Sequence, residues 1–122
     1  MKLHASGPVP YNAITAYGDD YGAVNSQRHQ SSLIVLPDRV EPWDVSEFTK
    51  ITMEDFEKLK NLDVEILLLG TGPKQRFPHP RLTAPLTAAG IGLEVMDLKA
   101  ACRTYNILVA EERKVAAALM FR

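Results

Sequence analysis

The second half of the chain alternates between continuous apolar runs and amphipathic stretches, the pattern of an α/β fold. Residues 64–69 are mostly aliphatic, and the run ends at the turn Gly70-Thr71-Gly72. A run without polar alternation is typical of a strand buried on both faces, as in a parallel sheet covered by helices. A second strand is expected at 92–96, and the spacing between the two strands fits a right-handed βαβ crossover.

The sequence predicts three helices, near residues 53–61, 81–89 and 98–110. The first should begin with an acidic variant of the capping box, formed by Thr52 and Asp55. Met53, Phe56 and Leu59 recur at helical spacing, so we expect them to face the sheet while the charged residues between them face water.

Prolines and glycines indicate where the other helices begin and end. Pro85 falls near the middle of the second helix, which therefore either starts late or is kinked, and Gly90 is the expected left-handed stop. Asp97 is a good N-cap for the third helix. Residues 115–120 could continue that helix on propensity alone, but we expect a closing strand, because one helix of more than twenty residues would be long for this domain.

Residues 1–45 are rich in turn formers, and the short β-type runs between the turns predict antiparallel strands. These runs lie at 13–17 and 32–36, and a hairpin with a longer loop is expected around 17–22. The polar tract 25–31 is either a solvated strand or a mobile loop.

Composition places the chain among ordinary globular proteins. Its 122 residues suffice for a single domain, 1–122, with 46% apolar and 24% charged residues. The net charge of −1 and the scattered basic residues argue against a nucleic-acid partner. No apolar run approaches the roughly 20 residues of a transmembrane segment, and residues 1–6 show no secretory signal. With one cysteine, which suits a reducing compartment, the features predict a cytoplasmic protein.

The loop Gly70-Thr71-Gly72 is a candidate ligand-binding element. It follows a buried strand, where open α/β sheets usually bind ligands, and its glycines would let backbone N–H groups approach an anion. Lys74 and Arg76 add donors nearby. The dinucleotide fingerprint also needs a third glycine and an immediate helix, which are missing. The alternative is a turn whose glycines allow tight packing.

The remaining reactive side chains form no catalytic constellation. His79 could be a base or a metal ligand, but His4 and His29 are remote, so a solvent-facing loop histidine is favoured. Cys102 lies on the apolar stripe of the third helix and is interpreted as a buried, inert thiol. Trp43 is interpreted as a core anchor under the N-terminal sheet rather than a partner-binding aromatic. We therefore predict no catalytic residues, no metal site and no cofactor.

A polar set surrounds the last helix and its exit: Arg103, Thr104, Asn106, Glu111 and Arg113. Glu111 and Arg113 could form an ion pair that holds the turn into the closing strand. Arg103 should find a carboxylate elsewhere, because Lys99 one turn away repels it. The alternative is a ligand pocket or a partner surface. A site shared with Gly70-Thr71-Gly72 would require Arg103 or Glu111 to converge on the same pocket.

Several motifs resemble the Mth-like family of domains of unknown function. They are Leu36-Pro-Asp38, Pro42-Trp43 and the segments 66–72, 76–78, 89–97, 101–108 and 110–119. The resemblance covers most of the chain. It implies a three-layer β+β/α fold with a central mixed sheet and an antiparallel last strand, to which the pattern of residues 1–45 adds short N-terminal antiparallel strands.

The family resemblance also suggests a function. Its best-known eukaryotic branch is a mitochondrial assembly factor for respiratory complex I, which acts through protein–protein contacts, and another branch is linked to adipogenesis. The resemblance brings no established catalytic residues. It implies a non-catalytic binding protein that helps assemble a membrane-associated redox complex, with complex I subunits as partners. The alternative is a small-molecule or anion-binding protein, or an enzyme, with its site at Gly70-Thr71-Gly72.

Overall fold

The computed structural model describes residues 9–122, so the expectations for residues 1–6 and for His4 lie outside the described residues. A small sheet contains β1 (Ile14–Tyr17), β2 (Gly22–Val24) and β3 (Gln27–His29). A five-stranded sheet contains β4 (Leu33–Leu36), β5 (Arg39–Pro42), β6 (Ile66–Thr71), β7 (Gly92–Met96) and β8 (Val115–Met120). The helices are α1 (Met53–Glu57), α2 (Pro80–Ala88) and α3 (Leu98–Ala110), with 3₁₀ turns at Phe48–Lys50 and Lys58–Asn61.

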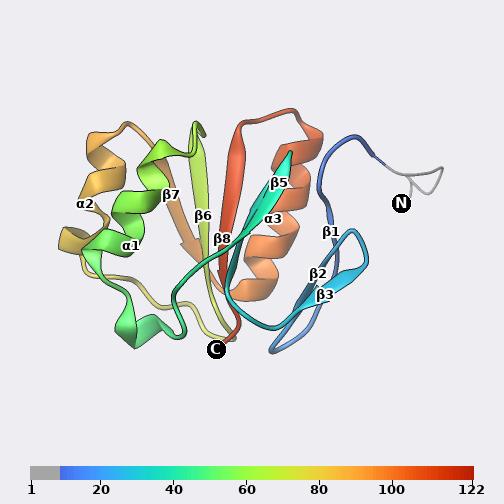
Figure 1. Cartoon of the computed structure of the whole chain (residues 1–122), viewed down its shortest axis with the longest axis horizontal. Helices are drawn as coiled ribbons and strands as arrows, with labels where there is room; N and C mark the ends of the chain where they lie inside the picture. The colour runs from blue at the N-terminus through green and yellow to red at the C-terminus, as the bar shows by residue number, and fades with distance from the viewer. Residues whose placement is uncertain (1–8) are drawn as a thin grey trace.

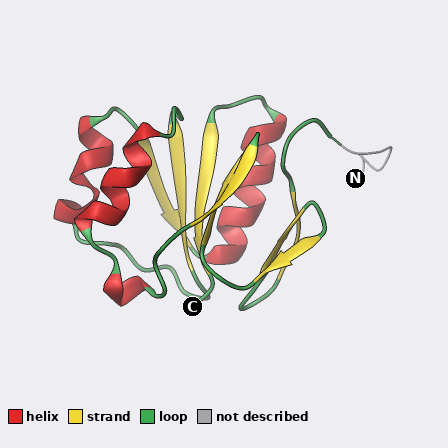
Figure 2. Cartoon of the chain, viewed as in Figure 1, coloured by secondary structure: helices red, strands yellow, loops and turns green. Residues whose placement is uncertain are grey.

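The five-stranded sheet forms the middle layer of the molecule (Figure 1). The helices α1 and α2 cover one face, and α3 with the small sheet lies on the other (Figure 2). This arrangement confirms the predicted three-layer α/β fold with short N-terminal antiparallel strands.

The strand order β5-β4-β8-β6-β7 places the last strand at the centre of the sheet. β8 runs parallel to β6 and antiparallel to β4, so the sheet is mixed, as expected. The expectation of an antiparallel last strand holds on the β4 side only. The crossover through α3 returns the chain to the end of the sheet where β6 and β7 begin, and β8 therefore runs in their direction.

Alternation along the strands divides the interior into two cores. Ile34 and Leu36 of β4 face the core under α1 and α2, whereas Leu33 and Val35 face the core under α3. All six residues of β8 are buried, and β6 contributes side chains to both cores. The continuous apolar run in β6 therefore reflects burial on both faces, as predicted.

Helix α1 begins with the expected capping box. The Thr52 hydroxyl accepts a hydrogen bond from the Asp55 N–H, and the Asp55 carboxylate accepts one from the Thr52 N–H. Phe56 and Leu59 are buried, as predicted. The prediction for Met53 was wrong, because its side chain is 48% exposed. The helix begins at this residue, and only its later turn packs on the sheet.

Helix α2 begins at Pro80 and contains Pro85, which excludes the late start. Its end has the hydrogen bonds of a Schellman motif: the N–H groups of Gly90 and Ile91 donate to the carbonyls of Thr87 and Leu86. Gly90 has a φ of +77°, so it is the left-handed stop that the sequence predicts.

Helix α3 also ends in a Schellman motif, but with glutamate in the left-handed position. Glu112 has a φ of +62° and donates to the Val109 carbonyl, while Arg113 donates to the Leu108 carbonyl. This turn separates α3 from β8 and confirms the closing strand. Asp97 caps the other end of the helix by accepting from the Ala100 N–H at 2.9 Å, as predicted.

Trp43 is buried, but not under the N-terminal sheet. It packs in the core under α1 and α2, where its ring meets Phe56 edge-on at a centroid distance of 6.2 Å. The small sheet instead contributes Ile14 and Val24 to the opposite core. Within the polar tract 25–31, residues Gln27–His29 form the strand β3. Over residues 9–122, no helix is both long and apolar enough to cross a bilayer.

Candidate functional site

The buried hydroxyl of Thr71 organises the loop that follows β6. It donates to the Lys74 carbonyl at 2.6 Å and lies 3.3 Å from the Met96 carbonyl at the end of β7. It also accepts from the Arg76 N–H at 3.0 Å. Adjacent parallel strands whose connections leave to opposite faces usually open a crevice at this edge. Here the Thr71 hydroxyl links the loop to the end of β7.

Gly70 and Gly72 lie where other chain segments approach closely. A Cβ at Gly70 would lie 3.0 Å from the Cβ of Ala101 and 3.0 Å from a methyl carbon of Leu119. A Cβ at Gly72 would lie 3.1 Å from the backbone of Arg122. The packing of α3 and the C-terminal segment against the turn therefore requires residues without side chains here, which supports the packing interpretation of the glycines.

The Arg76 side chain turns back onto its own loop. Its Nη2 donates to the Thr71 carbonyl at 3.2 Å, and the guanidinium stacks over the Phe48 ring at 4.7 Å. Its buried Nε has no hydrogen-bond partner among the described residues. Phe48 packs against the core under α1 and α2, on the opposite face from α3. Arg76 therefore does not converge with the polar residues of α3.

Asn106 binds β1 to α3. Its Oδ1 accepts from the Ile14 N–H at 2.9 Å, and its Nδ2 donates to the Ile14 carbonyl at 2.8 Å. Beside it, the Tyr105 hydroxyl donates to the Asn12 carbonyl at 2.8 Å. The amide of Asn106 thus pairs with β1 in the way that a residue of a neighbouring strand would. Sequence reasoning did not find this contact, because its partners are more than ninety positions apart.

The other residues of the α3 set lie in separate places. Arg103 is exposed near the middle of the helix, and its hydrogen bond to the Tyr17 hydroxyl, aided by Asp97, raises the pKa of its guanidinium. Thr104 is half-buried on the same helix. Glu111 is the last capping residue at the far end. The structure therefore does not bring Arg103 and Glu111 to one pocket.

The predicted ion pair between Arg113 and Glu111 does not form. The Arg113 Nε donates to the Glu65 carboxylate at 2.7 Å, which ties the exit of α3 to the residue before β6. The left-handed residue Glu112 turns the chain between the two predicted partners. The hydrogen bond from Arg113 lowers the pKa of the Glu65 carboxyl group. Both side chains are about half exposed, so we treat the pair as a local contact.

Cys102 and His79 have local structural environments. Cys102 is fully buried, and burial raises the pKa of its thiol to about 12, so the thiol stays protonated at neutral pH. His79 is exposed at the start of α2, where its Nδ1 accepts from the Arg81 N–H at 3.1 Å. Over residues 9–122, no group of three His, Cys, Asp or Glu side chains could hold a metal ion.

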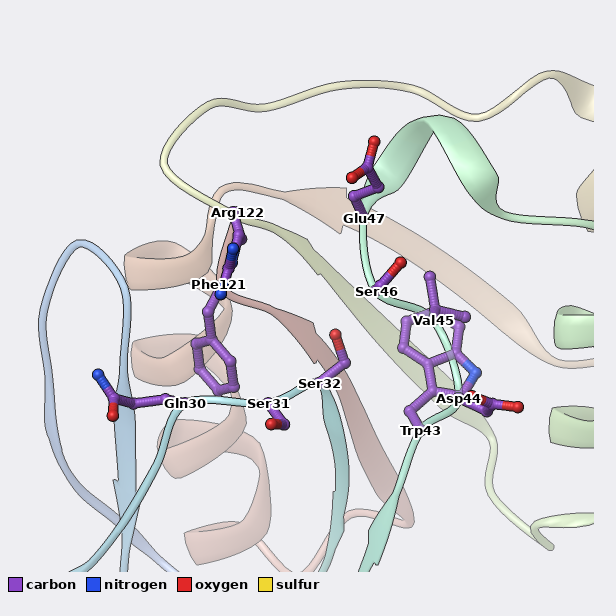
Figure 3. A pocket seen from close by; sticks show the side chains of 10 residues that line it. All are labelled: Gln30, Ser31, Ser32, Trp43, Asp44, Val45, Ser46, Glu47, Phe121 and Arg122. Carbon is purple, nitrogen blue, oxygen red and sulfur yellow. The ribbon is translucent and has the colours of Figure 1, made fainter.

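A groove of about 350 Å³ lies at the end of the central sheet where β8 finishes and β4 begins. Figure 3 shows Phe121 and Trp43 on opposite sides of it, with Ser31 and Ser32 between them and Trp43 Nε1 pointing away from Phe121. Its lining comes from three segments, 30–32, 43–47 and 121–122. Arg122 also abuts Gly72, so the groove adjoins the predicted loop. No single sequence motif signals a groove assembled in this way.

A family model described as a protein of unknown function, DUF498/DUF598, matches residues 14–120. The chain belongs to this family. The bovine protein named NADH dehydrogenase (ubiquinone) 1 alpha subcomplex assembly factor 3 is 33% identical to it over 113 residues. That match covers 88% of this chain and 61% of the bovine protein, and the match to the mouse counterpart covers 48% of that relative. The chain thus spans about half to three-fifths of these relatives.

Solved structures of similar proteins share the fold. A crystal structure of a Bordetella parapertussis protein is 40% identical, with a TM-score of 0.87, and the match covers 95% of this chain and 100% of that one. A solution structure of a Bordetella pertussis protein, described as an Mth938-like domain, is 36% identical, with a TM-score of 0.83 and coverage of 98% and 92%. These similarities confirm the Mth-like family assignment.

Proposed function

We propose that this DUF498/DUF598 protein is a non-catalytic binding protein that assists the assembly of a respiratory NADH dehydrogenase through protein–protein contacts. The observation that carries the proposal is the similarity to the bovine assembly factor across 88% of this chain. Its single cysteine suits a reducing compartment, so we infer that it acts from the cytoplasm.

The candidate reactive groups favour binding over catalysis, because their chemistry is already engaged within the fold. The Thr71 hydroxyl and the Arg76 guanidinium hydrogen-bond to their own loop. The Asn106 amide hydrogen-bonds to both backbone groups of Ile14, and the Cys102 thiol is buried and protonated. Groups in such contacts contribute rigidity, which a docking protein needs, rather than free donors or nucleophiles.

The test is co-purification of the tagged protein from its own host in mild detergent, with quantitative mass spectrometry. We expect enrichment of NADH dehydrogenase subunits over an untagged strain. Removing the gene should lead to accumulation of partly assembled dehydrogenase on native gels, and restoring it should reverse the effect. Normal dehydrogenase levels in the deletion strain, with no subunit enrichment, would contradict the proposal.

The second candidate function is binding of a small anion beside Gly70-Thr71-Gly72. A cavity of about 110 Å³ lies between Gly72, Pro73 and the first residues of α3, including Lys99. A helix N-terminus and an ammonium group both favour an anion. Two carboxylates also line the cavity and oppose one: Asp97 caps α3, and Asp19 pairs with Lys99 at 3.2 Å.

Inorganic phosphate, titrated while the backbone amide resonances are followed, tests this second candidate. Saturable shifts at Gly72 that disappear in Lys99→Ala would support it. Absence of saturable shifts would exclude phosphate binding here and leave assembly as the one proposed function. Substitution of Gly72 by valine is a poor test, because the new side chain would meet the Arg122 backbone and disturb the fold.

A further inference from the structure

Phe77 has the most exposed large apolar side chain that the structure describes, with 70% of its surface accessible. It lies in the connection from β6 to α2, in a segment that we call the basic loop, residues 73–81. Aromatic side chains are enriched in the centres of protein–protein interfaces, where a few anchors carry most of the binding energy. A phenylalanine exposed to this degree is therefore a candidate interface anchor.

The chain on both sides of Phe77 is fixed by hydrogen bonds. Before it, the Arg76 N–H and guanidinium bind Thr71, and the Gln75 Nε2 donates to the Val95 carbonyl at 2.9 Å. After it come Pro78 and the cap of α2, where His79 accepts from the Arg81 N–H. The chain that carries Phe77 is thus fixed on both sides before any partner binds, which lowers the entropic cost of docking.

The sequence on both sides of Phe77 carries positive charge only. The sequence contains no Asp or Glu from Gly72 to Leu93, whereas Lys74, Arg76 and Arg81 lie within four positions of Phe77. In the part of the chain that the structure describes, none of these three cations forms an ion pair. The chain has a net charge of −1, so the basic loop is a local feature.

We propose that the basic loop is a docking surface for a protein partner that receives Phe77 in an apolar pocket rimmed by Asp and Glu carboxylates. Charge complementarity specifies the rim, and the exposed ring specifies the pocket. A protein partner is favoured over an anionic membrane, because a single exposed ring suits a shaped pocket, whereas a fluid bilayer needs broader apolar area. The inference rests on the proposed function and names its contact surface.

Photo-crosslinking in the host tests the docking surface directly. The photo-reactive amino acid benzoylphenylalanine is placed at position 77 and, as a control, at position 107, where Ile107 is also exposed but lies on α3. We expect a discrete protein adduct from position 77 and not from position 107. Mapping the crosslinked peptide should identify a segment of the partner that contains acidic residues.

Charge reversal supplies the matched comparison. Lys74→Glu and Arg81→Glu should each reduce the adduct at position 77 at least about tenfold, since each opposes the acidic rim. Lys114→Glu makes the same change in charge at the opposite end of the sheet, just before β8, and should leave the adduct unchanged. Circular dichroism verifies that each variant is folded.

The outcomes separate the surface from the proposed function. An adduct that depends on Lys74 and Arg81 but joins a protein outside the dehydrogenase would support the surface and contradict the assembly role. Co-purification of the dehydrogenase that survives Phe77→Ser, without an adduct at position 77, would overturn the surface and leave the assembly role standing. Flotation with phosphatidylglycerol vesicles that requires Phe77, without a protein adduct, would overturn the protein-docking proposal in favour of a lipid surface.

Discussion

Gly72 and Gly90 share a left-handed backbone conformation but differ in their surroundings. Their φ angles are +85° and +77°. A Cβ at Gly72 would lie 3.1 Å from the Arg122 backbone, whereas nothing lies within 4 Å of a Cβ at Gly90. Because the atoms near Gly72 belong to the Arg122 backbone, no side-chain rotation can relieve the contact. The two positions therefore separate the cost of the conformation from the cost of close approach.

We expect Gly90→Ala to lower the free energy of unfolding by about 1 kcal/mol, the cost of a left-handed alanine. Gly72→Ala carries the same cost together with overpacking against Arg122, which adds about 1–3 kcal/mol. Urea unfolding of the two variants and the parent protein measures both values. Equal losses for the two variants would show that the approach of Arg122 to Gly72 is not tight in solution.

At the scale of whole elements, the contact between β1 and α3 depends on a few polar groups. Asn106 occupies both backbone groups of Ile14, and Tyr105 binds the Asn12 carbonyl. The small sheet that β1 begins has Val24 and Ile14 in the core beneath α3. These hydrogen bonds therefore position an entire layer of the molecule rather than one side chain.

Asn106→Ala should lower the free energy of unfolding by about 2 kcal/mol, because it leaves the N–H and carbonyl of Ile14 without partners. Amide exchange at Ile14 should also accelerate. Ile107→Ala, at the adjacent and 58% exposed position, should change stability by less than about 0.5 kcal/mol. Similar losses for both variants, with unchanged exchange at Ile14, would count against a specific role of the Asn106 amide.

For the molecule as a whole, two buried ionisable groups in the core under α3 make the free energy of unfolding depend on pH in the alkaline range. Burial raises the pKa of the Cys102 thiol from its ordinary value of 9.0 to about 12, and it raises the pKa of the Tyr105 hydroxyl above its ordinary value of 10.0. In both cases the folded protein holds its proton at a pH where the unfolded chain has lost it. Ionisation therefore favours the unfolded state.

Stability should be unaffected by these two groups below pH 9 and should fall as the pH rises from 9 toward 12. Each group contributes a slope of up to about 1.4 kcal/mol per pH unit once its unfolded form ionises. Urea unfolding at a series of pH values measures the slope. In Cys102→Ala the decline should begin about one unit later, where only Tyr105 remains. If the decline in stability began at the same pH in Cys102→Ala as in the parent protein, the Cys102 thiol would not be the group whose ionisation starts it.

Local patterns in the sequence predict much of the secondary structure. The capping residues Thr52 and Asp97, the stop at Gly90 and the apolar run of β6 each act through residues a few positions away, so their effects are visible in the chain itself. The stop at Glu112 is different, because glutamate seldom adopts a left-handed conformation and gives no sequence signal. Even there, the strand β8 was correctly expected from the length that a continued helix would have.

The sequence by itself determined the element types, the family and the two-sided burial of the central strands, since these depend on periodicity and local hydrogen bonding. Only the tertiary structure decided which polar residues meet. Asn106 bonds to Ile14 across 92 positions, Arg113 bonds to Glu65 across 48, and Arg122 approaches Gly72. Such contacts depend on how the layers stack and on where two distant strands end, and no local pattern encodes that geometry.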